Sequence, residues 1–217
     1  MGLLVEGKWV DRWYETKETG GKFVRQDAKW RDRVTADGKP AEGRTRGFKA
    51  EPGRYHLYVS LACPWAHRTL IFRKLKRLES IISLSVVDWL MAERGWRFSD
   101  RPGCIPDTVN GAGYLYEIYL TAKRDYTGRV TVPVLWDRKT ATIVNNESAE
   151  IIRMFNSAFD GLTGVARELD FCPAELIGEI DEINAMIYDN SARLRSYEIV
   201  ADIWKATAPA AANSAVK

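Results

Sequence analysis

The chain has 217 residues, of which 46% are hydrophobic and 28% are charged, enough for one full globular domain and part of a second. Its 32 basic and 29 acidic residues give a net charge of +3, which is too small to indicate a nucleic-acid partner. The sequence has no signal-peptide pattern, no apolar run as long as a membrane span, and three widely separated cysteines that do not resemble a secreted disulfide framework. We therefore expect a cytoplasmic protein that binds neither nucleic acid nor a membrane.

The first predicted segment is an N-terminal arm, residues 1–53. It is rich in Gly, Lys, Arg and Asp, carries scattered aromatic residues and shows no sustained hydrophobic period. This pattern predicts irregular structure that packs through its aromatic side chains.

A strand, a helix and a second strand are predicted next. Residues 55–60 alternate and are rich in β-forming residues. Pro64 suits the first turn of a helix, which the apolar spacing continues to about Arg77, and residues 81–89 form a second apolar strand. This order predicts a parallel pair of strands with a right-handed crossover. The spacing of the basic residues in the helix predicts a solvated face made of Arg68, Arg73, Lys74, Lys76 and Arg77.

A long connection, residues 90–129, follows and contains a short helical piece near 114–122. Residues 130–136 and 141–144 predict a hairpin, after which capping residues open a helix that runs to about residue 157. The order βαβ followed by ββα is that of a thioredoxin-like fold. We therefore predict an α/β, thioredoxin-like domain over residues 54–158.

The remaining chain is predicted to contain little further structure. Residues 159–190 read as a linker and one amphipathic helix, the latter at 173–189. Residues 191–217 form a divergent tail that ends in an alanine-rich sequence of low complexity. This tail is too polar and too short to build a second hydrophobic core.

Cys63 is the strongest candidate for chemistry. It follows a predicted strand and precedes Pro64, so its sulfur is expected at a helix N-terminus, where free N–H groups and the helix dipole favour the thiolate. Ala66 stands where a dithiol oxidoreductase has its second cysteine, so an external thiol must resolve any mixed disulfide on Cys63. An inert, buried cysteine is the alternative. His67 lies four residues away, but two ligands alone are weak evidence for a metal, and we expect none.

Two later segments suggest a site for a peptide-like ligand. If the Val132–Pro133 bond is cis, the turn there would present the Val132 backbone to a ligand beside Cys63. Glu147 and Ser148 open the last helix of the domain, so backbone N–H groups and the Ser148 hydroxyl can bind a carboxylate while Glu147 binds an amine. Ordinary capping of that helix is the alternative.

Four motifs, in order and in spacing, resemble the Xi-class glutathione transferases, the glutathionyl-hydroquinone reductases. They are SLACPWAHR at 60–68, the stretch from Asp88–Trp89 to GWRF at 95–98, RVTVPVLWD at 129–137 and IVNNES at 143–148. The resemblance runs from the arm to about residue 190. It implies a thioredoxin-like, glutathione-binding domain of the glutathione transferase type, followed by an all-helical domain.

This resemblance also implies a reaction and a set of site residues. Cys63 would attack the glutathione sulfur of a glutathionyl-hydroquinone, and a second glutathione would then leave as oxidised glutathione. Glutathione is the implied co-substrate, and no metal is implied. With the Val132–Pro133 bond cis, the implied glutathione-binding residues are Trp96, Arg129, Val132, Pro133, Glu147 and Ser148.

The sequence departs from the family pattern after about residue 190, so we expect a truncated helical region. The family takes its proton donor to the leaving hydroquinone from that region, and we transfer the role to no residue of this chain. The apolar surface that the truncation leaves exposed predicts self-association, for example as a homo-oligomer. Two alternative functions remain open: a glutaredoxin-like deglutathionylation of protein thiols, and a non-catalytic glutathione-binding module.

Overall fold

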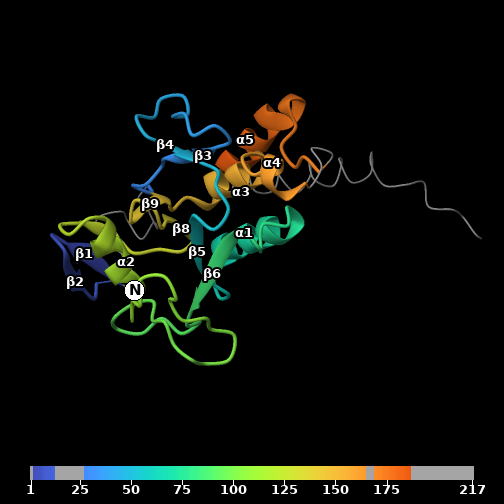
Figure 1. Ribbon diagram of the computed structural model, residues 1–217. Coiled ribbons are helices and arrows are strands. Elements are labelled where there is room, and N and C mark those ends of the chain that lie inside the picture. Colours follow the sequence, from blue (N-terminus) through green and yellow to red (C-terminus); the bar gives the residue numbers. More distant parts are fainter. Residues whose placement is uncertain (1, 13–26, 165–168, 187–217) are drawn as a thin grey trace, which may run out of the picture. The chain divides into compact units, whose positions relative to one another are not determined.

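The structure is a computed structural model that describes residues 2–12, 27–164 and 169–186. The chain divides into two compact units, Met1–Asp170 and Phe171–Lys217. The first unit holds every candidate site residue named above (Figure 1).

A four-stranded sheet forms the centre of the first unit. Its strands are β5 (Tyr55–Ser60), β6 (Ile82–Val87), β8 (Val134–Asp137) and β9 (Thr142–Asn145), in the spatial order β6-β5-β8-β9. β5 runs parallel to β6 and antiparallel to β8, while β8 and β9 form the antiparallel hairpin. Every residue of β5 is buried, because this central strand is covered on both faces. The order and directions confirm the predicted thioredoxin-like arrangement.

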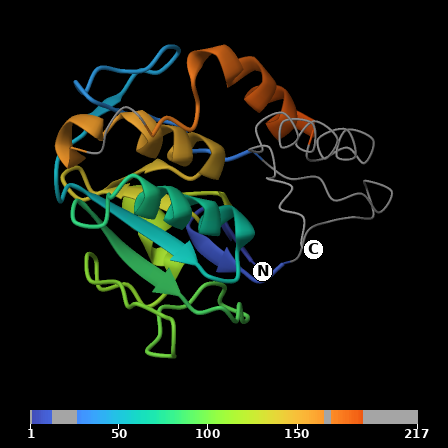
Figure 2. The same ribbon diagram turned by 90° about the vertical axis from the view of Figure 1, so that its right-hand side faces the viewer.

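Helices cover both faces of this sheet. α1 (Pro64–Leu75) and α3 (Ser148–Ser157) pack against each other on one face, and α2 (Leu115–Ala122) lies on the other (Figures 1 and 2). The buried side chains of α3 recur at helical spacing, at Ile151, Met154 and Phe155. One further turn, α4 (Asp160–Thr163), completes the unit.

The arm contains more regular structure than the sequence predicts. β1 (Leu3–Val5) pairs with β2 (Lys8–Val10) and with β7 (Gly128–Arg129), while β3 (Arg33–Thr35) runs parallel to β4 (Gly47–Lys49). Each of these strands has at most three residues, which is too short to show a period in sequence. Through β7 the arm is attached directly to the chain that leads to Val132.

The third predicted strand begins four residues later than expected, at Val134 rather than at residue 130. The structural reason is Tyr119, whose buried hydroxyl donates to the Thr131 carbonyl at 2.8 Å and accepts from the Thr131 amide at 3.2 Å. Because both backbone groups of Thr131 are engaged by this side chain, they cannot join a strand ladder.

The solvated face predicted for the helix at 64–77 is wrong for three of its basic residues. Arg73 is half-buried and donates to the Ile82 carbonyl at 2.8 Å. Lys76 is buried, pairs with Asp160 at 2.9 Å and donates to the Leu169 carbonyl at 3.0 Å. Arg68 reaches the start of α3, as described below. The spacing of residues along one helix does not reveal which neighbouring helix covers it.

The described part of the second unit is a short 3₁₀ turn, η1 (Ala174–Leu176), followed by α5 (Ile177–Met186). This agrees with the helix predicted at 173–189 as far as residue 186. The end of that helix and the predicted tail at 191–217 lie outside the described residues. Among the described helices, none is long and apolar enough to cross a membrane.

Candidate functional site

Cys63 is the N-cap residue of α1. Its backbone is extended, with φ −103° and ψ 112°, and its carbonyl accepts the first helical hydrogen bond, from the His67 amide at 2.9 Å. Pro64 takes the first helical position, where a missing N–H costs nothing. The Cys63 side chain is half-buried and makes no capping bond to the helix. Its sulfur therefore lies at the positive end of α1, as the sequence predicts.

The loop before β8 lies beside this sulfur. The Val132–Pro133 peptide bond is cis, and the Val132 carbonyl lies 3.8 Å from the Cys63 sulfur. Val132 itself is 7% exposed. A strand-like ligand at this loop would thus have its backbone partner directly beside the cysteine.

Tyr119 fixes the position of this loop, and the sequence analysis missed it. Besides its two bonds to Thr131, its hydroxyl accepts from the Asn146 side-chain amide at 3.3 Å. Asn146 immediately precedes Glu147 and Ser148, so one buried phenol ties the loop beside Cys63 to the start of α3. Burial raises the pKa of Tyr119, which keeps it a hydrogen-bond donor. Its partners are 12 and 27 residues away, and no local sequence signal could have revealed them.

The start of α3 brings three polar groups together. Glu147 is the N-cap, and its carboxylate accepts from the Ala149 amide at 3.3 Å. Arg68 donates to the Ser148 hydroxyl oxygen from Nε at 3.0 Å and from Nη2 at 2.7 Å, and lies 3.8 Å from the Glu147 carboxylate. Capping and ligand binding are therefore compatible here, because the Ser148 hydroxyl is not used to cap the helix.

Trp96 and Arg129 occupy other positions in the first unit. Trp96 is half-buried against the core, follows Gly95 at φ +78°, and its carbonyl accepts from the Leu115 amide at 2.9 Å. Arg129 lies in β7 and donates from Nη1 to the Arg12 carbonyl at 2.6 Å. Within the described ranges no hydrogen bond or ion pair joins either residue to Cys63. The structure thus unites Cys63 with Val132 and Pro133, and Glu147 with Ser148, but places Trp96 and Arg129 through separate contacts.

The two histidines play no part in this arrangement. His56 is buried between Ser83, at 2.6 Å from Nδ1, and Ser85, at 2.9 Å from Nε2. Ser85 donates its own proton to the Pro106 carbonyl, so Nε2 carries the histidine proton and Nδ1 accepts from Ser83. Burial lowers the pKa of His56 to about 4. His67 is exposed, and the described residues contain no group of three metal-ligating side chains.

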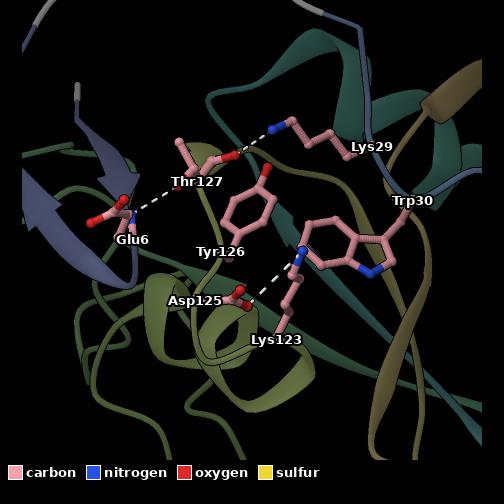
Figure 3. A pocket seen from close by; sticks show the side chains of 7 residues that line it. All are labelled: Glu6, Lys29, Trp30, Lys123, Asp125, Tyr126 and Thr127. Carbon is pink, nitrogen blue, oxygen red and sulfur yellow. Dashed lines mark hydrogen bonds and ion pairs between the residues drawn. The ribbon is translucent and has the colours of Figure 1, made fainter.

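A separate hollow of about 590 Å³ lies between the arm and the segment after α2 (Figure 3). The indole of Trp30 and the ring of Tyr126 form its apolar walls, and Lys29, which donates to the Thr127 carbonyl, lies at its rim. None of the residues that line it belongs to the candidate site around Cys63.

A half-buried cysteine at the start of the first helix, beside a cis-proline loop on the same sheet, defines a thioredoxin-like domain. Residues 62–158 match the family described as glutathione S-transferase, N-terminal domain. The chain is 60% identical to the glutathionyl-hydroquinone reductase YqjG of Escherichia coli, over 87% of this chain and 57% of that protein. It is 51% identical to the glutathionyl-hydroquinone reductase PcpF of Sphingobium chlorophenolicum, over 87% of this chain and 56% of that protein.

Solved structures give the same result. The Xi-class glutathione transferase from Natrialba magadii is 42% identical, with a TM-score of 0.75 over 94% of this chain and 67% of the other. The glutathione-bound structure of YqjG is 51% identical, with a TM-score of 0.72 over 81% and 63%. The chain therefore belongs to the Xi-class glutathione transferases. It spans a little more than half the length of the curated relatives that it matches.

Proposed function

We propose that this chain binds glutathione and reduces glutathionyl-hydroquinones through a mixed disulfide on Cys63. The observation that carries the proposal is the 3.8 Å separation between the Cys63 sulfur, at the N-terminus of α1, and the Val132 carbonyl of the cis-proline loop. The names of the relatives supply the substrate class, since two of them are glutathionyl-hydroquinone reductases.

In the first step the Cys63 thiolate attacks the sulfur of the glutathionyl group. The new S–S bond takes the place of the bond between sulfur and the ring carbon, and the electron pair of that bond leaves with the ring. The ring carbon then takes up a proton, which gives free hydroquinone. The ring is reduced by two electrons, and the two sulfurs are oxidised to a disulfide.

In the second step a glutathione thiolate attacks the mixed disulfide. Oxidised glutathione leaves and the Cys63 thiolate is restored, so one glutathione is consumed for each hydroquinone released. Ala66 stands where a resolving cysteine would be, which makes the external thiol necessary.

The glutathione molecule would be held beside the loop that leads into β8, near the starts of α1 and α3. The Val132 backbone, in the bend that Pro133 creates, would pair with its peptide groups, and the start of α3 at Glu147 and Ser148 would receive the amino and carboxylate groups of its γ-glutamyl end. Trp96 and Arg129 are proposed as further contacts of glutathione. Bound glutathione would connect these two residues to the rest of the site.

Deglutathionylation of protein thiols is a second candidate function. It needs only the thiolate and the glutathione site, and all the groups proposed for these lie in the first unit, before Phe171. The hydroquinone reaction additionally requires a proton for the ring carbon.

A turnover assay tests the proposal. The purified chain is mixed with a glutathionyl-hydroquinone and excess glutathione, and free hydroquinone and oxidised glutathione are measured. We expect equal amounts of both, and their loss in Cys63→Ser. Cys104→Ser, which removes a half-buried cysteine outside the site, is the matched control and should retain turnover. Release of glutathione from a glutathionylated peptide without release of hydroquinone would favour the second candidate and refute the first.

A further inference from the structure

Arg68 is a residue of α1 that contacts the start of α3 and has no role in the proposed reaction. It lies on α1, five residues after Cys63, and its guanidinium reaches across to α3 rather than into solvent. Its side chain is 23% exposed, and its guanidinium lies 5.2 Å from the centre of the Trp65 ring, a distance that indicates a cation–π contact. The guanidinium is thus held in place beside the start of α3.

The contacts of Arg68 determine what the Ser148 hydroxyl can do. A hydroxyl oxygen accepts two hydrogen bonds and donates one. Arg68 supplies both N–H donors, from Nε at 3.0 Å and from Nη2 at 2.7 Å. The Ser148 proton is therefore left to act as a donor. Ser148 is 1% exposed, and within the described part of the chain its hydroxyl proton has no acceptor.

A buried hydroxyl donor without an acceptor is a costly arrangement in a folded protein. Here it lies at the N-terminus of a ten-residue helix, beside a guanidinium. The Ala149 amide already donates to the Glu147 carboxylate, which lies 3.8 Å from the Arg68 guanidinium. A ligand carboxylate would therefore accept from the Ser148 hydroxyl and share the guanidinium with Glu147.

We propose that Arg68 is a specificity-determining residue that directs the Ser148 hydroxyl, and its own positive charge, onto the α-carboxylate of the γ-glutamyl end of glutathione. This inference rests on the proposed function, since it assumes that glutathione binds beside Cys63.

The spacing along α1 supports this assignment. Arg68 lies five residues after Cys63, the N-cap of α1, so both residues are positioned by the same helix. One rigid helix would therefore set both the nucleophile and the carboxylate contact.

The experiment compares two ligands rather than one. S-methylglutathione cannot form a disulfide, so its dissociation constant reports binding alone, and its analogue with an amide in place of the γ-glutamyl α-carboxylate removes the anion. Both are titrated calorimetrically into the full chain and into Arg68→Ala, Arg68→Lys and Ser148→Ala. Lys74→Ala is the matched control, because it removes one positive charge from the same helix at an exposed ion pair with Glu79.

We expect Arg68→Ala to weaken binding of S-methylglutathione about 10–100-fold, which corresponds to about 1.4–2.8 kcal/mol, and to change binding of the amide analogue less than about threefold. Arg68→Lys should recover part of the loss, since a point charge lacks the two-pronged geometry. Ser148→Ala should likewise weaken binding of S-methylglutathione more than binding of the amide analogue. In the Ser148→Ala chain, the further change Arg68→Ala should weaken binding of S-methylglutathione by a smaller factor than it does in the wild-type chain. Lys74→Ala should change neither ligand.

Equal weakening of both ligands by Arg68→Ala would overturn the inference, because it would show a merely structural role. An unchanged dissociation constant for S-methylglutathione in either Arg68 variant would overturn it as well, and Arg68→Lys keeps this test available if the alanine variant does not fold. If the wild-type chain binds neither ligand, the proposed function fails, and the inference fails with it.

Discussion

Replacement of Tyr119 by Phe tests whether one buried hydroxyl holds the two halves of the proposed glutathione site together. The change removes no apolar volume but leaves the Thr131 carbonyl, the Thr131 amide and the Asn146 side-chain amide without the hydroxyl that lies 2.8, 3.2 and 3.3 Å away, respectively. An unsatisfied buried polar group costs about 1–3 kcal/mol. Thr131 is only half-buried, so we expect a total loss of about 2–4 kcal/mol in the free energy of unfolding.

The same substitution should weaken glutathione binding, because the loop that carries Val132 and the start of α3 lose their common anchor. Urea denaturation measures the stability, and the midpoint should decrease while the slope stays constant. Tyr126→Phe is the control: the Tyr126 hydroxyl donates to the Arg129 carbonyl at 3.1 Å, and the loss of this hydrogen bond should cost about 1 kcal/mol. A loss below about 0.5 kcal/mol in Tyr119→Phe, with unchanged glutathione affinity, would refute the reasoning.

Three further predictions concern the scaffold of the first unit. The pKa of His56 is about 4 in the folded chain and about 6.5 in the unfolded chain. The contribution of neutral His56 to the free energy of unfolding is therefore complete above pH 6.5 and should fall by on the order of 3 kcal/mol toward pH 4. Thermal unfolding across this pH range should show a smaller loss of stability in His56→Gln than in the wild-type chain. Asp137→Asn breaks the buried pair with Arg54 at 2.7 Å and should cost about 3 kcal/mol in urea denaturation, whereas an unchanged midpoint would contradict the role of this pair. Burial acts to raise the pKa of Glu150, but hydrogen bonds from Arg31 at 2.7 and 2.8 Å outweigh burial and lower that pKa. Glu150→Gln should therefore loosen the attachment of the arm and speed limited proteolysis before residue 50. Cleavage at the wild-type rate would contradict this role of Glu150.

Local sequence patterns were sufficient where a structural feature depends on neighbouring residues. The alternation at 55–60 and the proline after Cys63 predicted β5 and the start of α1, and the structure confirms both. The hairpin of β8 and β9 was also predicted, with its first strand starting four residues too early. These elements place Cys63 at the start of α1, so the position of this residue could be inferred from sequence alone.

Features that depend on distant residues were missed. Tyr119, Arg68 and Lys76 act on partners that lie between 12 and 93 residues away, and nothing in their own segments marks them. The three-residue strands of the arm are stabilised by pairing, as β1 with β7, rather than by their own composition. The full set of residues proposed to bind glutathione came from the family resemblance. Such a resemblance indicates which distant residues act together, but it gives no physical reason for it.

The central claim is that Cys63, at the start of α1, carries the glutathionyl group during the reaction. It is tested most directly by mixing equimolar chain and glutathionyl-hydroquinone without free glutathione, and mapping the modified peptide by mass spectrometry while free hydroquinone is measured. We predict one glutathione adduct per chain, on Cys63 alone, formed at the same rate as hydroquinone and removed when glutathione is added. Release of hydroquinone without an adduct, or an adduct confined to Cys104 or Cys172, would contradict the account.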